Sequence, residues 1–143
     1  MLHDVQPISY HRNPEDLLAN RRAALERFLA DYERGLGNHR YIVGELPSLP
    51  FASGSFGLAV CSHLLFLYSD LRSEAFHIES LRELCRVAHE VRVFPLLTLR
   101  RKPSPHLAPV RSALEAEGWT SEVVCVDYEL QRGGNQMLKV FRA

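Results

Sequence analysis

Apolar and polar residues alternate with a helical period in the first part of the chain. Asn13 is a suitable N-cap, Pro14 suits the first helical position, and two acidic residues follow in the first turn. Behind them, apolar residues recur at helical spacing, namely Leu17, Leu18, Leu25, Phe28, Leu29 and Tyr32. The pattern predicts a helix over residues 13–36 that is ended by Gly35 or Gly37. Residues 1–12 show no period, so we expect an irregular arm there.

The residues from 40 to 143 alternate between short apolar runs and amphipathic segments. An uninterrupted apolar run such as GLAVCS, residues 57–62, is typical of a strand that is covered on both faces. Amphipathic stretches that begin after a serine are typical of helices. We therefore expect, in order, strands at 40–43 and 58–61, a helix within 69–90 capped by Ser73, a strand at 91–99, a helix within 104–119 that opens with Ser-Pro, and strands at 121–130 and 135–142.

This order of elements predicts an α/β fold. Strands that alternate with helices usually form a parallel sheet with right-handed crossovers. The link QRGG, residues 131–134, favours antiparallel pairing of the last two strands. A chain of 143 residues suits one domain. We therefore expect a single domain over residues 1–143, whose α/β core at 40–143 has a mostly parallel sheet, a C-terminal antiparallel hairpin and flanking helices.

Charge and cysteine content narrow the class of protein. Lys plus Arg and Asp plus Glu both number 17, so the net charge is zero, whereas nucleic-acid binding calls for clustered positive charge. We interpret the basic run at 100–102 as a solvated loop. The three cysteines have no metal-binding spacing, and their odd number makes a poor disulfide framework. With no long apolar run and no signal sequence, we expect a cytoplasmic protein with reduced thiols and no metal, nucleic-acid or membrane partner.

Three stretches of the sequence form a recognisable pattern when they are taken together. They are GELPSLPFASGSFGLAVCSHLLFLYSD at 44–70, ESLRELCRVAHEVRVFPLL at 79–97 and VVCVDYELQRGGNQMLKVF at 123–141. Together they resemble the C-terminal portion of class I S-adenosylmethionine-dependent methyltransferases, from Phe28 to Arg142. The resemblance implies a truncated Rossmann-like methyltransferase fold. It also implies S-adenosylmethionine as the methyl donor, if the donor site is completed, and a small-molecule acceptor.

The chain departs from this family in its first part. A family member would carry a Gly-rich donor loop after strand one and an acidic residue after strand two, and the sequence has neither. Without those strands, the strand at 58–61 keeps an unpaired edge, and unpaired backbone groups must be covered. The strand at 40–43 could slide across to it, or a second copy could pair with it. Alternatively, the chain lacks an N-terminal half.

The resemblance implies donor contacts from four residues. Glu45 stands where the family often has an acidic residue near the adenine amino group, and Leu46 would pack beside it. Cys61 and Ser62 end a strand, and ligands of open parallel sheets bind at the carboxyl ends of strands. The structural alternative for Glu45 is a solvated loop carboxylate, and Ser62 could instead stabilise the turn that follows.

Acceptor chemistry is implied for four other residues. His63 could act as a base on an acceptor hydroxyl or amine, and Tyr68, Tyr128 and Arg132 could line the acceptor pocket. Alternatively, His63 caps the turn, and Tyr128 and Arg132 are packing and hairpin residues. A Ser-His hydrolase is disfavoured, because adjacent side chains on a strand are expected to diverge and no G-x-S-x-G motif occurs.

Two hypotheses of function follow. In the first, the chain is a methyltransferase-like protein that is truncated and has no donor site of its own. In the second, it is a catalytically inactive remnant that works as a homo-oligomeric or partner-binding module. The first predicts donor binding and the second predicts oligomers without donor affinity.

Overall fold

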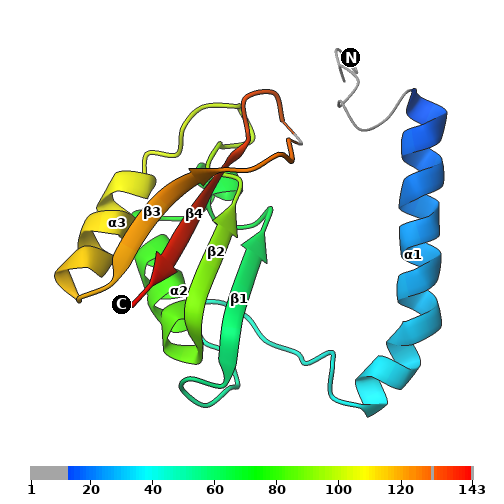
Figure 1. Cartoon of the computed structure of the whole chain (residues 1–143), viewed down its shortest axis with the longest axis horizontal. Coiled ribbons are helices and arrows are strands. Elements are labelled where there is room, and N and C mark those ends of the chain that lie inside the picture. The colour runs from blue at the N-terminus through cyan, green and yellow to red at the C-terminus, as the bar shows by residue number, and fades with distance from the viewer. Residues whose placement is uncertain (1–12, 130, 143) are drawn as a thin grey trace. The chain divides into compact units, whose positions relative to one another are not determined.

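Figure 1 shows a computed structural model of the chain, which describes residues 13–129 and 131–142. The chain divides into two compact units, one up to Val43 and one from Gly44 onward. The arm expected at 1–12 lies outside the described residues, and a single domain over the whole chain stays a prediction.

The first unit contains the helix α1, which spans Pro14–Gly37. The side chain of Asn13 accepts a hydrogen bond from the backbone N–H of Asp16 at 2.8 Å. This bond satisfies one of the N–H groups that have no partner inside the first turn. The helix ends at Gly37, the later of the two glycines that the sequence offers as a stop.

The strand expected at 40–43 does not form. Instead, Tyr41 turns back onto α1, where its hydroxyl donates a hydrogen bond to Asp31 at 3.1 Å and its ring covers Gly35. A Cβ atom on Gly35 would collide with Cε2 of Tyr41, so the close approach requires glycine. Arg40 binds the same Asp31 carboxylate at 2.6 Å. A strand needs a neighbour for its N–H and C=O groups, and residues 40–43 have no such neighbour in the part of the chain that is described.

The second unit confirms the α/β class. In chain order its elements are β1 (Phe56–Ser62), the short 3-10 helix η1 (Phe66–Tyr68), α2 (Glu74–Val87), β2 (Ala88–Phe94), α3 (Leu107–Ala116), β3 (Thr120–Cys125) and β4 (Gln136–Phe141). The four strands form one sheet in the order β1-β2-β4-β3.

The sheet is mixed, so the expectation of a mostly parallel sheet is not confirmed. β1 and β2 run parallel, whereas β4 lies between β2 and β3 and is antiparallel to both. The expected closing hairpin of β3 and β4 forms. The second strand of this hairpin, β4, also pairs with β2. Two of the three strand pairings in the sheet therefore involve the hairpin.

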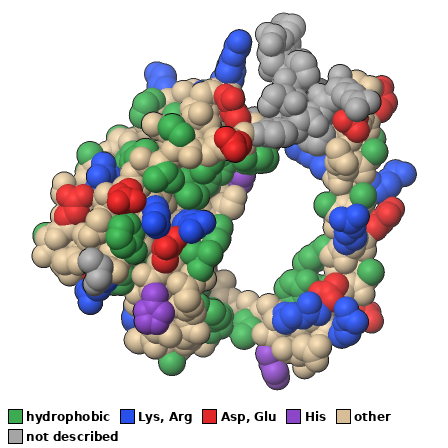
Figure 2. Space-filling model, in the orientation of Figure 1, with side chains coloured by type: hydrophobic (Ala, Val, Ile, Leu, Met, Phe, Trp, Pro, Cys, Tyr) green, Lys and Arg blue, Asp and Glu red, His purple; other side chains and the backbone are tan. Residues whose placement is uncertain are grey.

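β1 lies at the edge of the sheet, and no other described strand pairs with its outer side. Residues 40–43 form no strand that could pair with it. Phe56, Leu58 and Val60 alternate along β1 on the face opposite to the buried Cys61, and all three are exposed, Val60 to 64%. Figure 2 shows apolar and charged side chains mixed over the side of this unit that faces the viewer.

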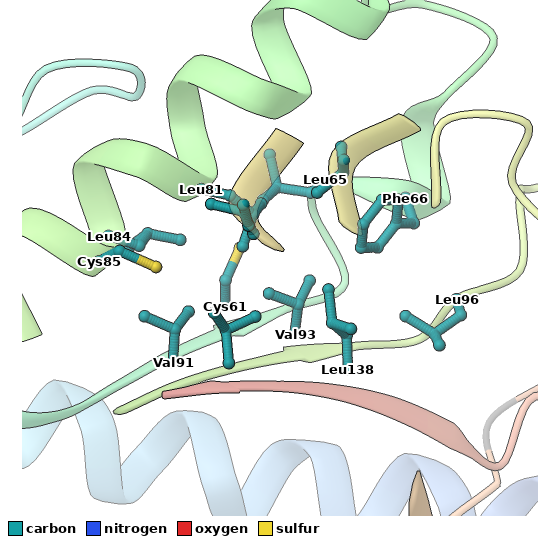
Figure 3. Packing of buried hydrophobic residues seen from close by; sticks show 13 residues of the cluster. Cys61, Leu65, Phe66, Leu81, Leu84, Cys85, Val91, Val93, Leu96 and Leu138 are labelled. Atoms are coloured by element: carbon teal, nitrogen blue, oxygen red, sulfur yellow. The ribbon is translucent and has the colours of Figure 1, made fainter. Parts of the chain in front are cut away.

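The hydrophobic core lies between the sheet and the helices α2 and α3. In Figure 3, side chains of β1, β2 and β4 point from the sheet toward the residues of α2, with Phe66 and Leu96 closing one end. The fully or nearly buried members of this cluster are Cys61, Leu65, Phe66, Leu81, Leu84, Cys85, Val91, Val93, Leu96, Val110, Leu114, Leu138 and Val140. Among the described residues of the second unit, this core covers one face of the sheet.

Helix α2 passes into strand β2 without a connecting loop. Val87 is the last helical residue and Ala88 the first residue of the strand, and both are buried. At the other end, the Ser73 side chain accepts a hydrogen bond from the N–H of Phe76 at 3.1 Å, as the sequence predicts.

Helix α3 begins later than the sequence predicts. The Ser104 hydroxyl does not cap a helix: it lies 2.7 Å from the Ser69 hydroxyl and accepts a hydrogen bond from the N–H of His106 at 3.1 Å. The helix therefore starts at Leu107. Strand β2 ends earlier than expected, at Phe94, because the proline that follows has no N–H to donate.

Candidate functional site at the carboxyl ends of the strands

Three loops meet at one end of the sheet. β1 runs parallel to β2, and β4 is antiparallel to both β2 and β3. β1, β2 and β3 therefore all run in one direction. The loops that follow them, 63–73, 95–106 and 126–135, therefore leave the sheet at the same end, as Figure 1 shows. Ligands of open α/β sheets bind at this end.

Ser62 and His63 form a close pair at the tip of β1, with the Ser62 hydroxyl oxygen 2.6 Å from Nδ1 of His63. The expectation that these side chains diverge is therefore wrong. His63 has already left the strand, because its φ of +56° lies in the left-handed region. Its N–H donates to the carbonyl oxygen of Phe94 at 2.7 Å, which holds this turn in place.

Two aromatic rings hold the His63 ring. The ring centroid of Phe94 lies 5.5 Å from that of His63, and Tyr128 lies 6.3 Å away, both in edge contacts. The Nε2 atom of His63 is buried and has no hydrogen-bond partner among the described residues. Ordinary cores contain few such groups, so this nitrogen calls for an explanation, and a functional role is one.

Cys61 contributes its side chain to the core and not to the loop end. It is buried beside Leu81 and Val93 in the cluster of Figure 3. Burial raises the pKa of its thiol, and a backbone hydrogen bond from Leu65 partly opposes the shift. A contact between Cys61 and a bound donor would therefore come from the backbone.

Glu45 and Leu46 are not brought next to the Ser62–His63 pair. They form a tight turn in which the Ser48 N–H donates to the Glu45 carbonyl oxygen at 3.0 Å. The Glu45 side chain is exposed, while Leu46 packs against the core. Leu49, just after them, is hydrogen-bonded to Glu83 near the end of α2. Helix α2 ends where β2 begins. That anchor is therefore at the amino end of β2, whereas Ser62 and His63 are at the carboxyl end of β1.

Sequence reasoning missed Glu83, the residue that makes this anchor. Its carboxylate accepts the backbone N–H of Leu49 at 2.6 Å and binds Arg86 at 2.8 Å. Arg86 in turn donates to the Ser53 hydroxyl at 3.2 Å. The hydrogen bond from Arg86, aided by that from Leu49, lowers the pKa of Glu83 to about 2, although burial opposes the shift. The spacing of Glu83 and Arg86 is visible in the sequence, but the contact with Leu49 is not.

Of the three residues predicted to line the acceptor pocket, one contacts His63. Tyr128 reaches the His63 ring, as described above. Tyr68 lies in η1, and no hydrogen bond or ring contact links its side chain to His63 in the described part of the chain. Arg132 is exposed in the loop between β3 and β4.

Within the described residues, Glu45 and Leu46 therefore do not converge with Ser62. Within residues 13–129 and 131–142, no three His, Cys, Asp or Glu side chains come together as a metal site would require. None of the described helices combines the length and the apolar character needed to cross a bilayer.

Comparison with known proteins finds a longer relative with no known role. An uncharacterized protein of Methanocaldococcus jannaschii is 31% identical to this chain over 122 residues, which make up 85% of the chain and 52% of the relative. The chain therefore spans about half the length of the curated relative that it matches. No protein-family model and no solved structure matches the chain.

Proposed function

We propose that the chain forms the C-terminal part of a class I S-adenosylmethionine-dependent methyltransferase and binds the donor only when further polypeptide completes the sheet. The sequence stretches at 44–70, 79–97 and 123–141 support this assignment. The sheet is compatible with it, because the strand at the first stretch pairs parallel with the strand at the second, and the closing hairpin follows antiparallel.

The observation that carries the proposal is the free edge of β1. No other described strand pairs with the outer edge of this seven-residue strand, and its side chains Phe56, Leu58 and Val60 are exposed. Another strand and its helix would bury this surface. The M. jannaschii relative has about as many residues outside the match as inside it. In our proposal, a corresponding segment pairs with β1 and supplies the donor contacts that the described residues lack.

Within this site we assign proton transfer to Ser62 and His63. The Ser62 side chain is exposed, and His63 Nδ1 lies behind it at 2.6 Å. An acceptor hydroxyl or amine that meets Ser62 could pass its proton to the Ser62 oxygen while the Ser62 proton moves to Nδ1. Tyr128, which contacts the His63 ring, would line the acceptor pocket with Arg132, whereas Tyr68 keeps this role only as a prediction from the sequence.

The test is a calorimetric titration of S-adenosylhomocysteine into two proteins. We expect saturable binding by the whole M. jannaschii relative and no binding by the 143-residue chain alone. Absence of binding by the relative, under conditions where it is folded, would remove the donor from the proposal. Micromolar binding by the chain alone would contradict the need for a completing segment.

The alternative function, a homo-oligomeric or partner-binding module without catalysis, rests on the same edge. A second copy could pair with β1 and bury Val60 and its neighbours. The two proposals differ in solution mass, because the module must associate by itself. A dimer mass together with no donor binding by either protein would favour the module.

A further inference from the structure

The basic run at 100–102 belongs to a tightly held turn and not to a loose loop. Thr98, which is only 4% exposed, lies at its base. Its side-chain oxygen accepts the N–H groups of Arg100 and Lys102 at 3.2 and 3.4 Å. Its own N–H donates to the Lys102 carbonyl oxygen at 2.8 Å, and its carbonyl accepts the N–H of Arg101 at 2.9 Å. Four hydrogen bonds to one residue fix the backbone from which these cations project.

The loop between β3 and β4 packs against the same turn. The side-chain amide of Gln131 donates to the Thr98 carbonyl oxygen at 3.3 Å. Gly134 lies against Leu97, the residue that precedes Thr98. A Cβ atom on Gly134 would be 3.5 Å from Cδ1 of Leu97. Arg132 is between these two contact points in the sequence. Its backbone therefore lies near the turn that carries Arg101 and Lys102.

Three cations at this place have no charged partner among the described residues. Arg100 pairs with Asp70 at 3.2 Å, and the Glu129 carboxylate accepts the N–H of Gly133. Arg101, Lys102 and Arg132 are exposed and form no ion pair within residues 13–129 and 131–142. Figure 2 shows Lys and Arg side chains standing out from the end of the sheet at which the β1 and β2 arrows of Figure 1 end, with acidic ones nearby.

We propose that Arg101, Lys102 and Arg132 bind an oxyanion group, a carboxylate or a phosphate, of a small-molecule acceptor. This inference rests on the proposed function and adds the class of acceptor to it. Like charges that project from neighbouring segments repel one another, and a bound anion relieves the repulsion. Arginine offers a planar fork of donors that fits carboxylate and phosphate oxygens. The site also lies at the end of the sheet where Ser62 and His63 are.

The experiment titrates sodium phosphate and, separately, sodium acetate into the isotopically labelled 143-residue protein while backbone amide resonances are followed by NMR. Sodium chloride keeps the ionic strength constant, because exposed charges are screened by salt. We expect saturable shifts confined to residues 98–103 and 131–134. Saturation by phosphate alone identifies a phosphate group, and saturation by acetate as well identifies a carboxylate.

Two charge-matched variants test the assignment. Arg132→Gln should weaken anion binding about three- to fivefold, the effect of losing one partly exposed ion pair of roughly 1 kcal/mol. Arg142→Gln removes the same charge just beyond β4, at the opposite end of the sheet, and should leave binding unchanged. Equal weakening by both variants, or shifts spread over the whole chain, would overturn the site.

The titration needs no methyl donor, so its failure can be told from failure of the proposed function. No saturable shift, combined with donor binding by the M. jannaschii relative, would overturn the anionic acceptor and leave the methyltransferase standing. Saturable shifts without donor binding by the relative would keep the anion site and remove the reaction that we assign to it.

Discussion

The Glu83 carboxylate accepts a hydrogen bond from the backbone N–H of Leu49, which lies 34 residues earlier in the chain, at 2.6 Å. Arg86 joins the same carboxylate and donates to the carbonyl oxygen of Leu49 at 3.3 Å. One ion pair on α2 therefore satisfies both backbone groups of Leu49. The segment that leads into β1 is held to the helix by these bonds.

Replacement of Glu83 by glutamine should loosen this segment. The amide keeps the shape of the side chain but cannot pair with the Arg86 charge. We expect the free energy of unfolding to fall by about 1–3 kcal/mol, the range for hydrogen bonds to charged groups. Urea unfolding measures the change. Glu79→Gln, an exposed change on the same helix, is the control, and equal stabilities of the two variants would contradict the role of Glu83.

The same pair predicts a pH dependence. The pKa of Glu83 is lowered from 4.5 to about 2, mainly by the hydrogen bond from Arg86. The unfolded chain therefore binds a proton at Glu83 at a higher pH than the folded chain does. Its contribution to stability is complete above about pH 4.5 and is lost as the pH falls toward 2. The stability difference between wild type and Glu83→Gln should shrink over this range, and a difference that grows would refute the assignment.

Gly35 and Gly37 form a matched pair for testing the first unit. A Cβ on Gly35 would collide with the Tyr41 ring, whereas a Cβ on Gly37 meets nothing within 4 Å. Gly35→Ala should therefore displace Tyr41 from Asp31, and Gly37→Ala should not. Burial, followed by the hydrogen bond to Asp31, raises the pKa of Tyr41 above 10. A spectroscopic pH titration of tyrosine should show a lower Tyr41 pKa in Gly35→Ala only.

His77 is fully buried, and both of its ring nitrogens face backbone carbonyl oxygens. Nδ1 lies 2.7 Å from the Ser73 oxygen and Nε2 lies 3.0 Å from the Leu65 oxygen. His77→Leu keeps similar volume but leaves the two carbonyl oxygens without a ring nitrogen beside them. We expect a loss of about 1–3 kcal/mol in the free energy of unfolding. His89→Leu, at an exposed position, should change it by less than about 0.5 kcal/mol, and thermal or urea unfolding compares them.

The free edge of β1 makes a prediction about association. Val60→Lys places a charge on the exposed face of β1 and should cost little stability, because the side chain is 64% exposed. If the edge takes part in self-association, the weight-average mass from light scattering should fall toward 16.3 kDa in this variant. Leu71→Lys changes a comparably exposed residue outside the sheet and should leave the mass unchanged.

The elements that could be predicted from the sequence are those with local causes. Asn13 and Ser73 cap their helices because a cap needs only the next three residues. The strand at 40–43 failed because strand formation depends on a neighbour that the sequence does not reveal. Helix α3 began late because Ser104 bonds with Ser69, which is 35 residues away.

The candidate site shows the same limit. The sequence places Ser62 at the end of a strand, and β1 does end there. The contact between Ser62 and His63 was missed because a left-handed backbone is uncommon for any residue other than glycine, although histidine adopts it more often than most. The cations at 100–102 are exposed, as expected for a solvated loop. The buried Thr98 that fixes their backbone could not be predicted, because its burial is a property of the fold.

The direct passage from α2 into β2 has a consequence for how this protein can vary in length. An extra residue between Val87 and Ala88 would turn the buried stripe of the helix by about 100° relative to the strand, or exchange the two faces of β2. Either change would move core side chains into solvent. Relatives should therefore show insertions and deletions in the loop 126–135 and none at the helix–strand junction, so this junction is a fixed point for aligning distant sequences.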